Sequence, residues 1–242
     1  MTASVLEFAA VAKNYGGLRP LRIAQLRVEA GQRTAIVGFD RPAAEVFVNL
    51  ATGAALPDAG TVAMFDRPTS AITDSTDWLT TIDRIGIVSE RAVLLEQLTV
   101  VQNLAMSFTL DIEPPPPAER ARAEALAREV GVAQSAWDLP LATLDALTAM
   151  RVRLGRAVAL DPAVLLLEHA SAPLSAEAPA EFAASVRAVA AGRRLAVIAL
   201  TADESFARAL GAAVLLHEPA TGRLREGGRG WFGRRRQGSS LG

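Results

Sequence analysis

The sequence predicts a mixed α/β fold built on a parallel central sheet. Two continuous apolar runs, Val164 to Leu167 and Leu195 to Leu200, lack the alternation of a half-exposed strand. Such strands are typical of a parallel sheet that is covered on both faces. A helix-like segment, Glu177 to Ala191, separates the two runs and provides the crossover that parallel strands require. With 242 residues and 50% hydrophobic content, the chain is long enough to bury such a core.

The N-terminal part is expected to be rich in β-structure. Val5 to Val11 and Leu21 to Val28 have strand-like composition, and a turn at Tyr15-Gly16-Gly17 lies between them. Arg33 to Val37 predicts a third strand, and helix signals follow from Pro42. These elements precede the parallel strands and favour an antiparallel β portion at the start of the chain.

The remaining elements alternate between helix and strand. Helices are expected at Thr99 to Phe108, Pro117 to Val130 and Leu147 to Leu160. Short strands are expected at Thr61 to Phe65, Ile85 to Val88, Ala213 to His217 and Gly222 to Arg225. The prolines of 114–117 predict a stiff extended turn, and the basic residues of 227–242 predict a disordered tail.

Composition excludes several classes of protein. The formal net charge is −1, so no overall field favours nucleic acid, and no nucleic-acid partner is expected. The chain has no Cys, which excludes disulfides and thiolate metal sites. Neither a signal peptide nor a transmembrane helix is predicted, so a cytoplasmic protein is expected, with any membrane role supplied by a partner.

The segment GFDRPAAE, Gly38 to Glu45, follows a predicted strand and precedes a predicted helix. A phosphate-binding P-loop in this position reads GxxxxGK[ST], where glycines admit the phosphates, Lys contacts them and the hydroxyl binds Mg²⁺. Here Gly38 is kept, whereas Ala43, Ala44 and Glu45 replace the Gly, the Lys and the Ser/Thr. The only lysine, Lys13, lies well upstream. We expect Asp40 or Glu45 to cap the following helix, which leaves no phosphate-sized cradle.

Five ordered segments resemble the ATP-binding subunits of ABC transporters. The resemblance extends over roughly Val5 to Glu226, nearly the whole chain, and rests on spacing and connecting sequence rather than on catalytic residues. The segments are AIVGFDRPAAEVFVNLATG from Ala35, LPDAGTVAMFDRP from Leu56, IGIVSERAVLLEQLTVVQNLAM from Ile85, LDALTAMRVRLGRAVALDPAVLLLEHASAPLS from Leu144, and ALTAD from Ala199. In family terms they are similar to the Walker A region, its connection to the next strand, the Q-loop region, the signature helix with Walker B and D-loop, and the switch region.

The resemblance implies a P-loop NTPase-like architecture. It consists of a parallel-sheet core, an N-terminal antiparallel β portion and an inserted helical subdomain at about 90–160. The nucleotide-binding domain would span 1–226, followed by the basic tail, 227–242. As in the family, the chain would act in a dimer of two such domains.

The same resemblance places this chain's residues at the family's functional positions. Tyr15 matches the aromatic residue that stacks on adenine, although packing is the commoner role of a lone aromatic. Leu144 to Thr148, LDALT, replaces the LSGGQ signature. The remaining positions are the loop residues Gly38, Arg41, Ala43, Ala44 and Glu45 for the nucleotide, Glu90 for the Q-loop Gln, Glu168 for the Walker B Asp, His169 for the catalytic Glu, and Ala202 for the switch His.

These substitutions predict a degenerate site. Phosphoryl transfer depends mainly on positioned charges and hydrogen-bond donors, and losing one donor typically costs about 10²–10³ in rate. Weak or absent binding of ATP and Mg²⁺ is therefore expected, with no dedicated metal site and no efficient hydrolysis. We favour a pseudo-ATPase subunit of an ABC transporter. Two alternatives stay open: a divergent but active ATP-hydrolysing subunit, and a non-transport scaffold or regulator that reuses the fold.

The apolar stretch from Ala92 to Leu98 is the expected contact for a membrane permease. It follows the Q-loop position, where the family receives a short helix of its transmembrane partner. Packing within the helical subdomain accounts equally well for about half of these side chains. The expected partners are thus a permease and a second nucleotide-binding subunit, at the inner face of the cell membrane. The sequence does not specify the substrate, the direction of transport, any residual ATP binding, or whether the dimer is homo- or heteromeric.

Overall fold

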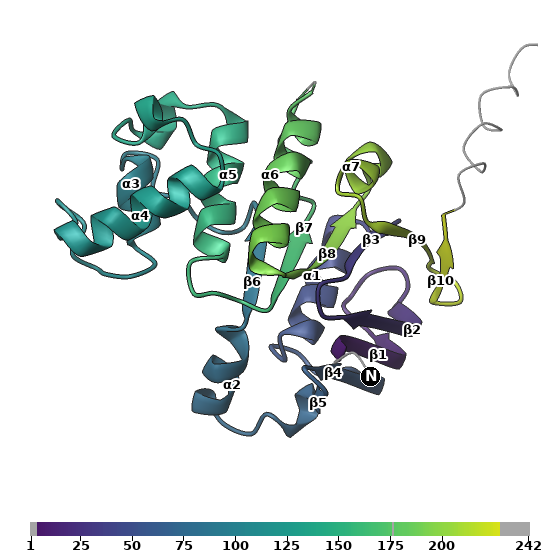
Figure 1. Cartoon of the computed structure of the whole chain (residues 1–242). Coiled ribbons are helices and arrows are strands. Elements are labelled where there is room, and N and C mark those ends of the chain that lie inside the picture. The colour runs from purple at the N-terminus through teal and green to yellow at the C-terminus, as the bar shows by residue number, and fades with distance from the viewer. Residues whose placement is uncertain (1–3, 176, 228–242) are drawn as a thin grey trace, which may run out of the picture.

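The computed structural model describes residues 4–175 and 177–227, and it contains two sheets (Figure 1). The larger sheet has six strands in the order β10-β9-β3-β8-β7-β6. β6, β7, β8, β3 and β9 run parallel to one another, and β10 is antiparallel to β9. The strands are β3 (Arg33–Val37), β6 (Ile85–Ser89), β7 (Val164–Glu168), β8 (Ala196–Thr201), β9 (Ala213–Glu218) and β10 (Arg223–Glu226). The predicted α/β fold with a parallel core is confirmed.

Both faces of the central sheet are buried. In β7, Leu165 and Leu167 belong to one hydrophobic cluster, whereas Val164 and Leu166 belong to another on the opposite face. Successive residues of a strand point to opposite faces, so an uninterrupted apolar run fills two cores at once. The absence of alternation in the sequence of this strand follows directly from this arrangement.

The second sheet is antiparallel, with the order β2-β1-β4-β5. Its strands are β1 (Ser4–Lys13), β2 (Leu21–Glu29), β4 (Ala59–Met64) and β5 (Arg67–Pro68). Helix α1 (Arg41–Ala51) packs between this sheet and the central one, and Phe47 of α1 stacks on Phe8 of β1 at 4.7 Å between ring centroids. The predicted antiparallel portion at the start of the chain is confirmed.

Five helices share one hydrophobic cluster with the opposite face of the central sheet: α3 (Val100–Ala105), α4 (Pro117–Glu129), α5 (Ala146–Ala157), α6 (Ala178–Arg193) and α7 (Glu204–Ala209). Figure 1 shows α3, α4 and α5 grouped beyond the β6 edge, within the range expected for the helical subdomain. Helix α3 is shorter than the predicted 99–108, because Thr99 is its N-cap in a capping box and the helix ends at Ala105. The tail from 228 lies outside the described residues, so its predicted disorder remains a prediction.

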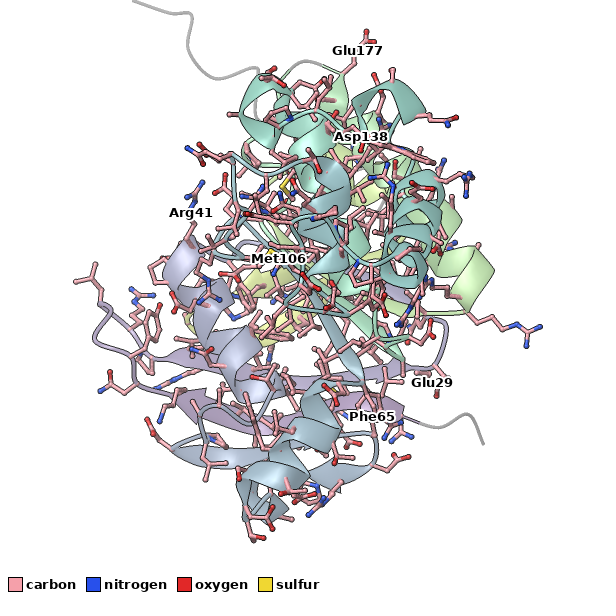
Figure 2. All side chains as sticks on the ribbon, turned by 90° about the vertical axis from the view of Figure 1, so that its left-hand side faces the viewer. Glu29, Arg41, Phe65, Met106, Asp138 and Glu177 are labelled. Atoms are coloured by element: carbon pink, nitrogen blue, oxygen red, sulfur yellow. The ribbon has the colours of Figure 1, made fainter. Side chains whose placement is uncertain are left out.

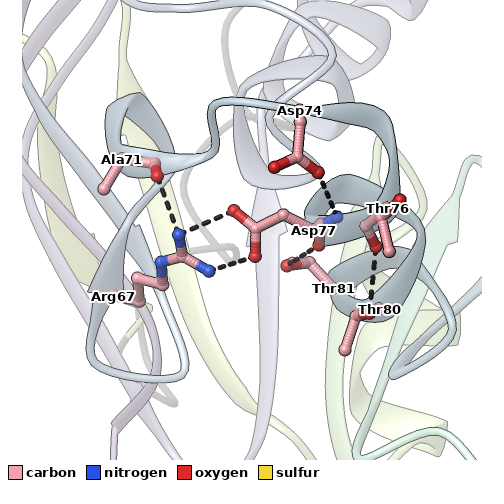
Figure 3. A network of polar contacts seen from close by, with 7 residues as sticks. All are labelled: Arg67, Ala71, Asp74, Thr76, Asp77, Thr80 and Thr81. Carbon is pink, nitrogen blue, oxygen red and sulfur yellow. Dashed lines mark hydrogen bonds and ion pairs between the residues drawn. The ribbon is translucent and has the colours of Figure 1, made fainter.

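Helix α2 (Ser75–Ile82), which we did not predict, has no fully buried residue. Figure 3 shows the polar network that fixes it: Arg67 of β5 pairs with Asp77 of α2 and donates to the Ala71 carbonyl at 2.7 Å. Asp74 caps the helix by accepting from the Asp77 N–H at 2.9 Å. Trp78 adds a hydrogen bond to the Thr52 carbonyl at 3.0 Å. None of the helices in the described ranges is both long and apolar enough to cross a membrane.

Candidate functional site

The segment 38–45 forms a helix start. Asp40 is the N-cap of α1, and its Oδ1 accepts a hydrogen bond from the Ala43 N–H at 2.8 Å. The Ala44 N–H bonds to the Asp40 carbonyl at 3.0 Å, so α1 begins at Arg41 with Pro42 in its first turn. Ala44 is fully buried. The predicted self-capping is confirmed for Asp40, and two backbone donors of this segment are used within the helix.

Glu45 has a different partner. Its carboxylate lies 2.8 Å from Arg91 Nη1, in the loop that follows β6. Arg91 also reaches Glu168 at the end of β7, with Nη2 at 2.7 Å and Nε at 3.2 Å from the same Oε2. One guanidinium therefore joins α1, the loop after β6 and the end of β7.

Sheet register explains this meeting. Ser89 and Glu168 are paired neighbours at the carboxyl ends of β6 and β7, so the loop after Ser89 starts beside Glu168. The Arg91 N–H donates to Ser89 Oγ at 3.1 Å, which turns the loop back towards the cleft. Glu90 leaves the same turn and pairs with Arg41 Nη2 at 3.0 Å. Figure 2 shows Arg41 at the end of α1 and projecting from the ribbon.

These side chains line a cavity of about 350 Å³ together with Pro42, Ser89 and His169. The Glu168 side chain is only 7% exposed, whereas Arg91 is half exposed. A buried carboxylate needs a paired cation or hydrogen-bond donors, and Arg91 supplies both. Elsewhere too, residues 4–175 and 177–227 contain no group of three or more His, Cys, Asp or Glu side chains placed to hold a metal ion.

His169 is positioned by its backbone at the end of the sheet. It has a left-handed φ of 45°, its N–H donates to the Leu200 carbonyl at 2.9 Å, and its carbonyl accepts from Ala172. Its ring is buried, and Nε2 has no hydrogen-bond partner within the described part of the chain. The structure thus places His169 beside Glu168, as the sequence requires, without engaging its ring nitrogen.

Tyr15 lies on the other side of the α1 start, in a cavity of about 670 Å³ that Gly38, Asp40, Ala43 and His217 also line. Its ring is partly buried against the β1–α1 core. Burial, followed by the nearby Asp40 charge, raises the pKa of Tyr15. Both expected roles are compatible with this position, since the ring packs on the core and also borders a cavity next to the loop.

The predicted signature segment, LDALT, and the predicted switch position, Ala202, also lie at or next to aspartate residues that cap helices. Asp145, within LDALT, caps α5 by accepting from the Thr148 N–H at 2.7 Å, and hydrogen bonds from the Thr148 hydroxyl and N–H lower its pKa. Ala202 is exposed and precedes Asp203, which caps α7 by accepting from the Phe206 N–H at 3.0 Å. Burial raises the pKa of Asp203, but hydrogen bonds from Ser205, Phe206 and other groups outweigh it and lower the pKa.

The segment Ala92 to Leu98 is held in place by polar contacts. Arg153 and Arg156 of α5 donate to the carbonyls of Ala92 at 3.2 Å and Val93 at 2.7 Å. Burial lowers the pKa of both guanidinium groups. Val93 is 73% exposed and Leu95 is also exposed, whereas Leu94 packs on the core.

A groove of about 340 Å³ lies beside this segment. It is lined by residues of the α2–β6 connection, of the segment itself and of α5, including Ile82, Ile87, Leu94, Arg156 and Leu160. Leu160 is exposed at its rim. The stretch therefore divides as the sequence suggested, with part of its apolar surface packed and part presented to solvent next to a groove.

The sequence did not indicate Arg91, Arg153 or Arg156 as site residues. Arg91 is 77 residues from Glu168 along the chain, and nothing in the local pattern distinguishes it from other surface arginines. The register between β6 and β7 is the feature that could have indicated Arg91, because it places the residues after β6 beside the end of β7. Arg153 and Arg156 lie in Leu147 to Leu160, where the local pattern predicts a helix and nothing more.

Comparison with known proteins points to one group. No family model matches the chain. Over 178 residues the chain is 30% identical to the sulfate/thiosulfate import ATP-binding protein CysA of Gloeobacter violaceus, covering 73% of this chain and 49% of that protein. It is 27% identical over 207 residues to the lipoprotein-releasing system ATP-binding protein LolD of Saccharophagus degradans, covering 84% and 90%. The chain thus spans about half the length of the first relative and most of the second.

Solved structures show the same fold. CbiO1 of Clostridium perfringens, part of the ABC transporter complex cbiONQ, has a TM-score of 0.74 with 19% identity, over 92% of this chain and 87% of that one. The dimeric cassette MJ0796 bound to ADP and Pi has a TM-score of 0.72 with 18% identity, over 92% and 97%. The homologues and structural neighbours are ABC transporter ATP-binding subunits, and the fold is that of the ABC ATPase cassette.

Proposed function

We propose that this chain is a subunit of an ABC transporter that has the ATPase fold and does not hydrolyse ATP efficiently at its own site. The observation that carries the proposal is the start of α1. The Asp40 carboxylate caps the helix at the place where a P-loop would bind phosphate, and Ala44 is buried where the phosphate-binding Lys would be.

The side chains around this helix start do not fit an ATP-bound Mg²⁺ ion. A P-loop NTPase offers a hydroxyl and a Walker B carboxylate to the metal. Here the corresponding residues, Glu45 and Glu168, are both paired with Arg91. Binding of ATP with Mg²⁺ is therefore weak or absent, although the Tyr15 cavity leaves room beside the loop for a ring.

The transport role rests on the family of the relatives and on the segment Ala92 to Leu98. Val93 and Leu95 are exposed, their neighbours Ala92 and Leu94 line a groove, and Arg153 and Arg156 fix the backbone of the segment. Exposed apolar side chains beside a groove are typical of a protein interface. We assign this surface to a membrane permease, which would hold the subunit at the inner face of the cell membrane, paired with a second nucleotide-binding subunit.

ATP binding to the purified wild-type chain tests the site. We expect no saturable heat by calorimetry with Mg·ATP, and no turnover above that of a Glu168→Gln variant. A second variant, Asp40→Gly with Ala43→Gly, Ala44→Lys and Glu45→Ser, removes the internal anion and supplies the missing Lys and hydroxyl. We expect it to bind nucleotide measurably without hydrolysing it. Wild-type turnover that disappears in Glu168→Gln would refute the pseudo-ATPase assignment and favour the divergent active subunit.

Co-purification tests the permease surface. A candidate ABC permease from the same genome, tagged and co-expressed, should retain the wild-type chain and lose most of it when Val93 and Leu95 are both changed to Ser. Leu18→Ser is the matched control, because Leu18 is fully exposed and lies outside this surface. Equal retention of all three proteins would refute the assignment and favour a scaffold role.

A further inference from the structure

The charged cleft between α1, the loop after β6 and the end of β7 has a cation of its own. Arg91 contributes three nitrogens, one to Glu45 at 2.8 Å and two to Glu168 at 2.7 and 3.2 Å. The planar guanidinium is suited to this, because its fixed fork of donors bridges carboxylates and it stays charged at every relevant pH.

The two carboxylates come from the positions that ligate the metal in P-loop NTPases. Glu45 follows the loop where the Ser/Thr hydroxyl binds Mg²⁺, and Glu168 ends the strand that carries the Walker B Asp. We propose that the Arg91 guanidinium is the resident cation of this cleft and takes the place of a divalent metal ion. This inference rests on the proposed function, in which the chain has an ABC ATPase fold with a substituted site.

The pairing of charges in the cavity supports the substitution. Glu45, Glu90 and Glu168 bring three negative charges to the cavity, and Arg41 and Arg91 bring two positive ones. Glu168 is buried, so it needs a permanent counter-charge. Arg91 is tethered two residues from the paired end of β6, and a dissolved ion would have to displace a cation that cannot diffuse away.

Removing the guanidinium should open the cleft to a dissolved cation. In Arg91→Gln, the carboxylates of Glu45 and Glu168 lose their shared partner, and oxygen ligands of this type are those that Mn²⁺ and Mg²⁺ prefer. Mn²⁺ binding is measured by electron paramagnetic resonance on nucleotide-free, full-length protein. We expect Arg91→Gln to bind one Mn²⁺ ion at least about tenfold more tightly than wild type, whose binding should be no tighter than that of Arg91→Gln with Glu168→Gln.

The matched control is Arg27→Gln, which removes an exposed arginine paired with Glu7 at 3.2 Å on the antiparallel sheet. It should bind Mn²⁺ as wild type does. The proposal is overturned if Arg91→Gln binds Mn²⁺ no better than wild type, or if wild type binds one ion that Glu168→Gln abolishes.

A stability measurement covers the case in which Arg91→Gln folds poorly. If Arg91 serves chiefly to neutralise Glu168, then Arg91→Gln lowers Tm, and adding Glu168→Gln recovers part of the loss. Mn²⁺ should raise the Tm of Arg91→Gln and leave wild type unchanged. Strictly additive losses would contradict the pairing. Neither assay contains nucleotide or permease, so failure of the transport assignment and failure of this inference give separate results.

Discussion

Asn103 anchors the segment that we assign to the permease. Its side chain is fully buried at the start of the helical group. Asn103 Oδ1 accepts from the Leu95 N–H at 2.9 Å, and Nδ2 donates to the carbonyls of Leu95 at 2.9 Å, Thr99 at 3.0 Å and Leu98 at 3.3 Å. One amide thus fixes both ends of a four-residue turn.

The cost of Asn103→Leu can be worked out from these partners. The carbonyls of Leu95, Leu98 and Thr99 each have a second backbone donor, so they stay paired after the change. All four side-chain hydrogen bonds of Asn103 disappear, and the Leu95 N–H loses its acceptor. At about 0.5 kcal/mol for each lost bond and a further 1 kcal/mol for the orphaned N–H, unfolding becomes easier by about 3 kcal/mol.

Urea denaturation measures this change, and hydrogen exchange locates it. For a chain of this size the loss corresponds to roughly 6–12 °C in Tm. Amides of 93–98 should exchange much faster in the variant, while those of β3 and β8 change only with global stability. Asn14→Ala is the control, because Asn14 is exposed and accepts one hydrogen bond, from Gly16. A loss no larger than that of Asn14→Ala, or unchanged exchange in 93–98, would refute the reasoning.

Three further predictions concern single positions. Burial lowers the pKa of His217 from 6.5, although the hydrogen bond that Nε2 donates to the Arg22 carbonyl opposes this shift. The unfolded chain therefore takes up the proton first, and stability is lost as the pH falls below about 6.5. His217→Gln should accordingly show a smaller decrease in Tm than wild type between pH 7.5 and 5.5. Gly60 has φ 79°, and a Cβ there would lie 2.3 Å from the Ala10 carbonyl oxygen. Gly60→Ala should therefore lower the free energy of unfolding, measured in urea, by at least about 2 kcal/mol. Gly192→Ala is in open space within α6 and should raise that free energy by about 0.5–1 kcal/mol. Asp40→Ala removes the α1 cap and should cost about 1 kcal/mol in the same assay, with Asp40→Asn close to wild type; equal losses would exclude capping as the cause.

The central strands could be predicted because their signal is local. β3 begins and ends at the predicted residues, and β7 extends the predicted run by one, since an apolar run bounded by polar residues marks a buried strand. Helix α2 could not be predicted in this way. It buries no complete side chain and depends on contacts with residues outside the helix, Asp77 with Arg67 and Trp78 with the Thr52 carbonyl.

In the candidate site too, the local contact could be predicted from the sequence and the long-range contact could not. The Asp40 cap was predictable because it acts on a donor three residues away. The Arg91 bridge was not, because it joins three segments that only strand register and the packing of α1 bring together. Charges that pair across long sequence separations leave no periodic pattern, so they become visible only when the fold is known.

The aspartate caps at Asp40, Asp145 and Asp203 are part of the chain, so their presence at the helix starts does not depend on the concentration of any dissolved anion. A phosphate bound to a helix end exchanges with solution, and its occupancy rises and falls with concentration. A carboxylate three residues away on the same chain is always present. Under the proposed function, the starts of α1, α5 and α7 keep the same hydrogen bonds in nucleotide-rich and nucleotide-free solution. In a pair with an active subunit, such a chain would be the half that holds one shape through the cycle, and the movement would come from its partner.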